Sequence, residues 1–495
     1  MSSVNPNASE SVWPVVIIGT GFGGQSAAVN LIKRGISDFL MLERRDFMGG
    51  TWCQNSYPGA AVDVQSPLYS LSFEPYPWSQ MFAEQDELAE YTHHVIDKYG
   101  LRDKTRLNHN VARVAWDDDA QLWHIKIDGQ PDLAARILIN SSGPLSTPKV
   151  PDFPGRERFA GPAFHTNDWQ HDVDYRGKKV AVIGSGASAA QVIPAITDDV
   201  AELHVFQRTP HWVIPRPDRK FGPVMRRLLA FKPFYKALRG VLYLALESRI
   251  VGFKYSRAML NLLAQKSAEK HLAKQVPDDT LRAKLTPDFT IGCKRIILSN
   301  TLYPALMRDH VTLHDETDGI AEITEDGITT ASGSQLDLDI IVWATGYDAT
   351  DGMISYPVVG RDGRTMADFW ADYPRAYLGT TLPDFPNLFI VTGPNTGIGH
   401  TSAIFMIEAQ MDYIMTCVDK VLKSDAKSIE VKPEAEARYT RYVHDEMTRT
   451  VWYDGGCDSW YKSESGRVVA MFPGFTFVFR WLARRFKRDD HVITA

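Results

Sequence analysis

Short apolar runs, each followed by a glycine-rich turn and a helical pattern, occur twice in the chain. Val15–Ile18 is an apolar run that ends at Gly19, and it predicts a buried parallel strand. A helical pattern follows as far as Gly35, and 39–42 predicts the next strand. The same order returns 165 residues later, with a strand over 179–183, a turn over 184–189, a helix over 189–196 and a strand over 203–206. The repeated order predicts an α/β protein with two Rossmann-like dinucleotide-binding domains.

A helical pattern replaces the strand pattern between about Phe221 and Lys284. We interpret this segment as a helical insertion in the second nucleotide-binding domain. Its basic and apolar composition is also typical of a helix on a membrane surface, but an insertion packed on its parent domain is the favoured interpretation. Strand patterns return over 340–343 and 388–391, and a long amphipathic helix is predicted near 402–422. The Arg-rich segment 480–488 is interpreted as solvated surface.

The first glycine-rich turn has the pattern G-x-G-x-x-G, with its glycines at Gly19, Gly21 and Gly24. The first glycine permits a tight turn, the second lets the backbone approach a pyrophosphate, and the third lets helix and strand pack closely. Glu43 ends the next strand, 24 residues after Gly19, where a carboxylate can accept hydrogen bonds from ribose hydroxyls. The strand, the helix and the acid argue against a glycine-rich turn without a ligand. An acid here excludes a 2′-phosphate, so the site suits FAD or NAD.

The second turn is the G-x-G-x-x-A variant, made of Gly184, Gly186 and Ala189. The strand that follows ends before Arg208 and Thr209 and carries no acid. A guanidinium and a hydroxyl at this place suit a phosphate on the ribose, so NADPH is preferred to NADH. Lys294 is a candidate second cation for that phosphate. The alternative for Arg208 is an ordinary surface arginine. With an FAD-type and an NADP-type site in one chain, hydride is expected to pass from nicotinamide to flavin.

Composition narrows the class of protein. A chain of 495 residues predicts two to four domains, and a net charge of −6 does not favour nucleic acid as a partner. The four cysteines form no CxxC pair, which argues against a disulfide scaffold, a metal site such as zinc, or a dithiol redox centre, and fits a reducing compartment. Residues 1–13 show no signal peptide and no apolar run is long enough to span a bilayer, so a cytoplasmic enzyme without integral membrane association is expected.

Between the two turns lie Phe159, Gly161, His165 and Trp169 in the spacing FxGxxxHxxxW. This resembles the signature of Baeyer–Villiger monooxygenases. The related flavin monooxygenases that oxidise sulfur or nitrogen have a similar motif, usually without the terminal tryptophan. The residue after Trp169 is usually Pro or Asp in the family, and here it is Gln170.

Further segments of the chain resemble the same family. The stretch from Gly50 to Asp63, with Thr51-Trp52 and Tyr57-Pro58-Gly59, matches the longer pattern [AG]GxWxxxx[FY]P[GM]xxxD. The other segments are Ala344-Thr345-Gly346, Lys294-Arg295, Ser459-Trp460-Tyr461 and Phe472-Pro473-Gly474, where Phe472 stands at a position at which the family commonly has Trp. The resemblance runs from Gly19 to Gly474, nearly the whole chain.

The resemblance implies a type I Baeyer–Villiger monooxygenase. In that family NADPH reduces FAD, O2 adds at flavin C4a, and the peroxide attacks a ketone, which yields an ester or lactone. It assigns catalysis to Arg295, with Asp63 to hold it, because an anionic peroxide and an alkoxide need a fixed cation. The alternative is an ordinary buried ion pair. It also assigns FAD contacts to Thr51, Trp52 and Asp63, and it suggests that Trp460 lies on a loop at the substrate or nicotinamide, although a core tryptophan is an equal alternative.

His165 and Trp169 are interpreted as motif residues that organise the link between domains, and not as catalysts. Segment 393–402 is expected to direct a helix N-terminus at the flavin. The predicted domains are an FAD-binding domain in two parts, 1–148 and 381–495, an NADPH-binding domain in two parts, 149–214 and 288–380 with a linker, and the helical insertion, 215–287.

Two other functions remain as alternatives. One is a flavin monooxygenase that oxidises sulfur or nitrogen, and the other is a catalytically silent flavoprotein that acts as a redox sensor. The particular ketone and the oligomeric state do not follow from the sequence.

Overall fold

The computed structural model describes residues 12–495. Residues 1–11, which hold most of the segment in which no signal peptide is expected, lie outside the described residues. The first apolar run forms β1 (Val12–Ile18), which is followed by α1 (Phe22–Lys33) and β2 (Leu40–Leu42). β1 lies between β2 and β6 (Leu133–Asn140) and pairs in parallel with both. The first strand–turn–helix–strand unit is therefore present at the predicted place.

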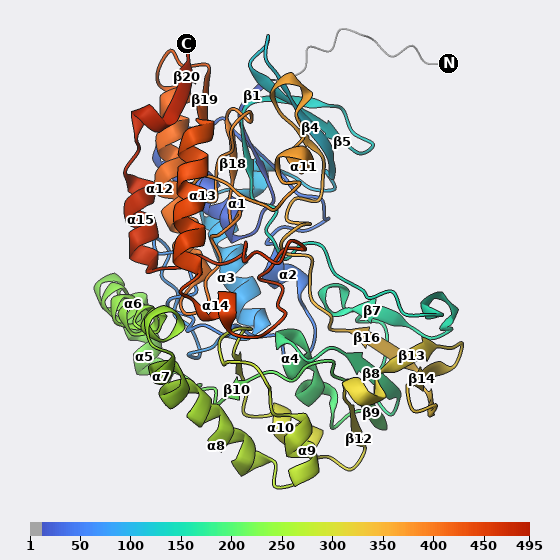
Figure 1. Cartoon of the computed structure of the whole chain (residues 1–495). Helices are drawn as coiled ribbons and strands as arrows, with labels where there is room; N and C mark the ends of the chain where they lie inside the picture. The colour runs from blue at the N-terminus through green and yellow to red at the C-terminus, as the bar shows by residue number, and fades with distance from the viewer. Residues whose placement is uncertain (1–11) are drawn as a thin grey trace, which may run out of the picture.

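An eight-stranded sheet is built around this unit in the upper part of the molecule (Figure 1). Its order is β17-β4-β5-β6-β1-β2-β3, and β18 pairs in parallel with β6. The strands not yet given are β3 (Thr105–Arg106), β4 (Val111–Asp117), β5 (Leu122–Ile127), β17 (Val358–Val359) and β18 (Leu388–Ile390). β17 thus joins the first sheet from within the range assigned to the second part of the NADPH-binding domain and linker.

The second sheet has five strands, all parallel, in the order β12-β9-β8-β16-β7. Its strands are β7 (Ala163–His165), β8 (Lys179–Ile183), β9 (Glu202–Phe206), β12 (Val311–His314) and β16 (Ile340–Trp343). Helix α4 (Ala187–Ile196) follows the second glycine-rich turn, and α10 (Leu302–Leu306) packs against it. A small antiparallel sheet of β13 (Ile320–Ile323), β14 (Gly327–Thr330) and β15 (Gln335–Asp337) lies at its side (Figure 1). The prediction of an α/β fold with two Rossmann-like domains is confirmed.

The helical insertion contains α5 (Pro223–Ala230), α6 (Lys232–Glu247), α7 (Arg257–Leu260), α8 (Lys266–Gln275) and α9 (Asp279–Lys284). Only its second half packs on the parent domain, where Leu272 of α8 belongs to the core of the second sheet. Leu229, Tyr235 and Leu246 of α5 and α6 instead belong to the core of the first domain. The expectation of an insertion packed on its parent domain is therefore wrong for α5 and α6. Helical periodicity shows which side of a helix is apolar, but not which domain receives the helix.

The C-terminal segment returns to the first domain. Helix α12 (Ala403–Leu422) packs on α1 and on α15 (Thr476–Arg484). The other elements of this segment are α13 (Pro433–Met447), α14 (Val451–Asp454), β19 (Ser428–Val431) and β20 (His491–Thr494). Across residues 12–495, each helix falls short of the length and apolar character that crossing a membrane requires.

Candidate active site

The first glycine-rich turn lies at the carboxyl end of β1, where its glycines permit close backbone approaches. Gly19 has a φ of +97°, and a Cβ atom there would lie 2.5 Å from the carbonyl oxygen of Ser141. A Cβ atom on Gly24 would overlap the carbonyl oxygen of Gly19. The third glycine therefore serves helix–strand packing, while Gly19 and Gly21 line a cavity. These close approaches are those of a tight turn packed against its helix, and the approach of Gly21 to a pyrophosphate stays a prediction.

Glu43, Thr51 and Trp52 line the same cavity. The carboxylate of Glu43 accepts hydrogen bonds from Thr20 Oγ1 (2.6 Å) and from the backbone N–H of Arg45 (3.2 Å), so its position is fixed at the end of β2. Trp52, on α2 (Thr51–Gln54), donates through Nε1 to the hydroxyl of Tyr69 at 3.3 Å.

Polar atoms in this cavity wall suit a polar ligand. Ser141 Oγ, Ser142 Oγ and Arg45 Nε are buried and have no hydrogen-bond partner among residues 12–495. Buried polar atoms normally have partners, so these three are placed for groups that a dinucleotide brings. The N-terminus of α12 also faces the cavity, because Ala403 and Ile404 contribute to its lining.

The second glycine-rich turn has open space on its ligand side. Gly184 has a φ of +128° and packs against the carbonyl oxygen of Ala344, whereas a Cβ atom on Gly186 would meet nothing within 4 Å. Ala189 is fully buried against the core of the second sheet. The turn is joined to the end of β9 because Ser185 Oγ donates to the carbonyl oxygen of Thr209 at 2.7 Å.

Two cations from distant parts of the chain, Arg208 and Lys294, lie close enough for their charges to interact. Arg208 is exposed, and Lys294 is half-buried with its Nζ atom 5.1 Å from the centre of the Phe289 ring. Burial lowers the pKa of Lys294, and the nearby charge of Arg208 lowers it further. Two mutually repelling cations at one place are suited to a phosphate.

Arg295 and Asp63 form a two-pronged ion pair between the domains. Arg295 Nε donates to Asp63 Oδ2 at 2.8 Å, and Nη2 donates to Oδ1 at 2.6 Å. Arg295 Nη1 also donates to the carbonyl oxygen of Ile398 at 3.4 Å, in the loop before α12. Burial acts to lower the pKa of Arg295, but the charge and hydrogen bonds of Asp63 outweigh it, so the pKa lies above its ordinary value. The guanidinium is a fixed, permanent cation.

Two buried tyrosines accompany the pair. Burial raises the pKa of Tyr69 to about 12 and that of Tyr461 to about 12, and the charges of Arg295 and Asp63 act on both hydroxyls. Both therefore stay protonated. Tyr69 also lines the cavity, and the charges of Asp63 and Arg295 act on its hydroxyl, so the ion pair lies near this part of the cavity wall.

The motif from 159 to 169 forms β7 and the turn after it, at the edge of the second sheet. β7 pairs with β16, and His165 lies opposite Trp343. His165 Nδ1 accepts from the backbone N–H of Asn167, and its ring packs edge-on against Tyr347 at 5.6 Å. Gln54 of the first domain donates to the carbonyl oxygen of Asn167 at 3.3 Å. Burial lowers the pKa of His165, so the ring is neutral at pH 7.

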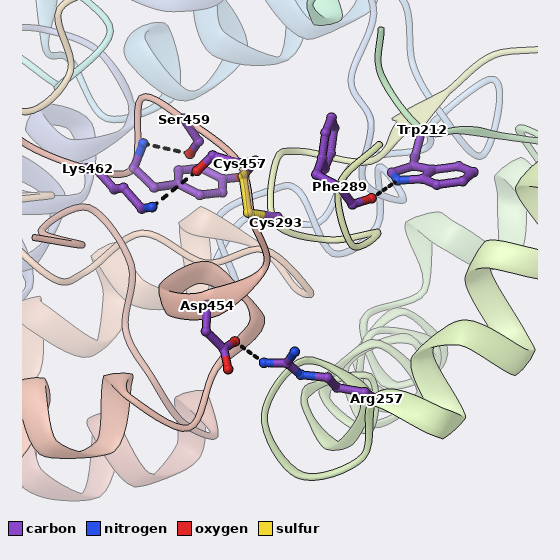
Figure 2. Close-up of a disulfide and its surroundings, with 9 residues drawn as sticks. Trp212, Arg257, Phe289, Cys293, Asp454, Cys457, Ser459 and Lys462 are labelled. Carbon is purple, nitrogen blue, oxygen red and sulfur yellow. Dashed lines mark hydrogen bonds and ion pairs between the residues drawn. A yellow bond between two sulfur atoms is a disulfide. The ribbon is translucent and has the colours of Figure 1, made fainter. Parts of the chain in front are cut away.

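The four cysteines contradict one sequence-based expectation. Cys293 and Cys457 form a disulfide across a sequence separation of 164 residues (Figure 2). The absence of a CxxC pair did not reveal it, because that test sees only neighbouring cysteines, and the fold brings these two loops together. Cys53 and Cys417 are free thiols.

The disulfide joins the loop that carries Lys294 and Arg295 to the loop that carries Trp460. Near the disulfide, Trp212 Nε1 donates to the carbonyl oxygen of Phe289 at 2.8 Å, just before the first loop (Figure 2). Arg257 of the helical insertion pairs with Asp454, just before the second loop (Figure 2). Trp460 is about half exposed and packs edge-on against the buried Tyr461, so the alternative of a core tryptophan does not hold.

His211 and Ile398 were not singled out from the sequence. Burial, with the charge of Lys294, lowers the pKa of His211 to about 4, and the ring lies near the backbone of Arg295. A lone histidine after a strand gives no sequence signal. The role of Ile398 depends on its backbone carbonyl, which every residue has, so the sequence gives no signal for it.

The fold and the site define an oxidoreductase with two dinucleotide-binding domains. Residues 16–230 match the family described as pyridine nucleotide-disulphide oxidoreductase. A Baeyer–Villiger monooxygenase of Pseudomonas aeruginosa is 44% identical over 497 residues, which cover 100% of this chain and 94% of that protein. This chain belongs to the Baeyer–Villiger monooxygenase family.

Solved structures agree with this assignment. Cyclohexanone monooxygenase from Rhodococcus sp. Phi1, bound to NADP+, has a TM-score of 0.89 at 28% identity, with 98% of this chain and 100% of that chain covered. OTEMO in complex with FAD and NADP has a TM-score of 0.88 at 26% identity, with the same coverage.

Proposed function

We propose that this monooxygenase uses FAD, NADPH and O2 to convert ketones into esters or lactones. The observation that carries the proposal is the Arg295–Asp63 pair, which holds a permanent cation between two dinucleotide-binding folds. The family to which the chain belongs supports it, as do the FAD and NADP that the solved OTEMO structure contains.

FAD is assigned to the first cavity. Gly19 and Gly21 leave room for the pyrophosphate, Gly24 keeps α1 close to β1, and Glu43 accepts hydrogen bonds from the ribose. The fixed carboxylate of Glu43 and the unpaired Ser141 and Ser142 hydroxyls in the wall support this assignment. Thr51 and Trp52 also line this cavity, and Asp63 is assigned to the FAD site by the family pattern. When bound, FAD supplies hydride acceptance and activation of O2.

NADPH is assigned to the second turn. Gly184 and Gly186 allow the backbone to approach its pyrophosphate, and Ala189 keeps α4 close to β8. Arg208 and Thr209, at the end of β9, receive the 2′-phosphate together with Lys294. The proximity of the two cations supports this preference over NADH, because a phosphate relieves their repulsion.

Arg295 is assigned the catalytic role of stabilising negative charge on oxygen. Three of its five N–H groups are used in bonds to Asp63 and Ile398, so two remain for reactant oxygens. Asp63 prevents the guanidinium from turning away, which keeps the charge preorganised while the substrate carbonyl oxygen becomes anionic. Tyr69 and Tyr461 stay protonated beside it and add no competing charge.

The remaining assignments concern organisation. Phe159, Gly161, His165 and Trp169 are assigned to the contact between the domains, which the bond from Gln54 to Asn167 supports. Trp460 is assigned to the loop that covers substrate or nicotinamide. The domain boundaries are kept as predicted from the sequence. The protein is assigned to the cytoplasm. In that compartment the Cys293–Cys457 disulfide would be of the transient or redox-sensing kind.

The test is NADPH and O2 consumption by the purified holoenzyme with linear, cyclic and aryl ketones, with each product identified by mass. Ester or lactone formation in step with NADPH oxidation is the expected result. Sulfoxides or N-oxides without any ester would favour the alternative monooxygenase. No NADPH oxidation at all would favour the silent flavoprotein.

A further inference from the structure

The solvent-facing side of α6 is apolar. Val241 and Leu244 are 65% and 67% exposed, and Ala237 is exposed one turn earlier on the same side. A surface helix normally buries its apolar stripe and turns its polar residues to water. In α6 the inner side buries Tyr235 and Leu246 together with the polar Arg239, while Val241 and Leu244 face water on the other side.

Hydrogen bonds fix α6 in this orientation. Arg239 Nη1 donates to the carbonyl oxygens of Pro67 (3.1 Å), Leu68 (3.0 Å) and Ser70 (2.7 Å). The hydroxyl of Tyr235 bonds with Ser70 Oγ at 2.8 Å. Turning the helix to bury Val241 and Leu244 would remove these bonds and leave polar atoms unpaired. The exposed apolar side is therefore a built-in feature of the fold.

Helices α5 and α15 lie along the same edge of the molecule as α6 (Figure 1). They also carry exposed apolar side chains. The C-terminal end of α6 contacts α15, because Tyr243 and Glu247 bond with the Thr476 hydroxyl at 3.1 Å and 2.8 Å. On α15, Phe477 and Trp481 are 50% and 49% exposed. We call the following set the apolar face: Val224, Leu228, Phe231, Val241, Leu244, Phe477 and Trp481.

The segments that carry the apolar face are rich in cations although the chain as a whole is acidic. Residues 219–257 hold ten Lys and Arg and one acid, and residues 476–488 hold five cations and no acid. That one acid, Glu247, is buried. Arg227, Lys232, Lys236 and Arg485 are exposed, and none of them forms an ion pair with another residue of the range 12–495.

Charge selects the occupant of this face. In a two-fold dimer the same patch meets itself, so cations would face cations. An anionic lipid surface offers the opposite charge to the cations and an apolar interior to the Phe, Trp, Leu and Val side chains. We propose that the apolar face docks the protein on an anionic bilayer, with its apolar side chains in the interfacial layer and Arg227, Lys232, Lys236 and Arg485 on the headgroups. The inference does not depend on the reaction that the enzyme catalyses.

The test is sedimentation of the FAD-loaded, full-length protein with vesicles. Vesicles of phosphatidylcholine mixed with phosphatidylglycerol should bind the protein, pure phosphatidylcholine should bind it much less, and salt should weaken binding. Val241→Glu/Leu244→Glu should weaken binding about 30-fold or more, because two inserted groups become anionic. The matched control, Val12→Glu/Val492→Glu, changes two exposed valines of β1 and β20, outside α5, α6 and α15, and should bind normally.

FAD absorbance and the thermal midpoint confirm that both variants are folded. A second variant, Lys232→Gln/Lys236→Gln, keeps the apolar residues and should bind about tenfold or more weakly to the anionic vesicles. The proposal is overturned if the wild type does not bind anionic vesicles at low salt, or if Val241→Glu/Leu244→Glu binds as tightly as the wild type. It is also overturned if the wild type does not bind the vesicles but forms a dimer, and Val241→Glu/Leu244→Glu abolishes that dimer.

Discussion

Replacing Arg295 by alanine separates the two halves of the proposed reaction. An anionic oxygen about 4 Å from a guanidinium gains about 4 kcal/mol at an effective dielectric constant of about 20, and a carboxylate about 8 Å away on the far side takes back about half. Asp63 is such a carboxylate, since it binds Arg295 through Nε and Nη2. Asp63 and its repulsion remain in the variant, so replacing Arg295 loses the whole attraction of about 4 kcal/mol. This corresponds to about 10³-fold in the rate of ester formation, at the upper end of the losses of about 10² to 10³ known when a preorganised donor is removed.

The assay combines three measurements on the purified variant. Anaerobic mixing with NADPH should reduce the flavin at close to the wild-type rate, because the second nucleotide site is untouched. Ester yield from a ketone that the wild type accepts should fall by at least the factor above, with NADPH oxidation no longer matched by product. Arg176→Ala, which removes an arginine beside Asp174 on the surface, is the control and should behave as wild type. An Arg295→Ala enzyme that makes ester within about twofold of the wild-type rate would refute the role of the cation.

Three further perturbations have defined outcomes. Arg208→Ala should raise KM for NADPH about tenfold or more and change KM for NADH less than about twofold, because a charged hydrogen bond to the 2′-phosphate is lost; equal effects in steady-state kinetics would contradict the phosphate role. Reducing the Cys293–Cys457 disulfide should lower the melting temperature, since a cross-link contributes about 2–5 kcal/mol to stability. Cys457→Ser should melt at the same temperature with and without dithiothreitol. A wild-type melting temperature that dithiothreitol leaves unchanged would contradict a stabilising role of the disulfide. The pKa of His211 is about 4 in the folded protein, so the unfolded chain binds more protons as the pH falls below about 6.5, and the free energy of unfolding declines by about 2 kcal/mol between pH 7 and pH 5. His211→Gln should remove this part of the decline, measured as melting temperature against pH. A pH profile that stays the same in the variant would show that the buried ring does not cause the decline.

Local features of the sequence determined the two nucleotide-binding units. The strands at 179–183 and 340–343 have the predicted bounds, and α12 begins one residue after its cap, Ser402. These features are readable because apolar runs, glycine-rich turns and helical spacing act over a few neighbouring residues.

Only the tertiary structure decided what distant residues do together. Asp63 and Arg295 are 232 residues apart, and the motif resemblance named both without showing that they form a two-pronged bond. The disulfide and the electrostatic influence of Arg208 on Lys294 likewise require distant segments of the chain to fold together first. The helical spacing of α6 was visible in the sequence, but the exposure of Val241 and Leu244 was not, because it depends on carbonyl oxygens of the first domain that hold Arg239 inside. A helix pattern fixes which residues share a side, whereas the partners that each side meets are set by the packing of the whole chain.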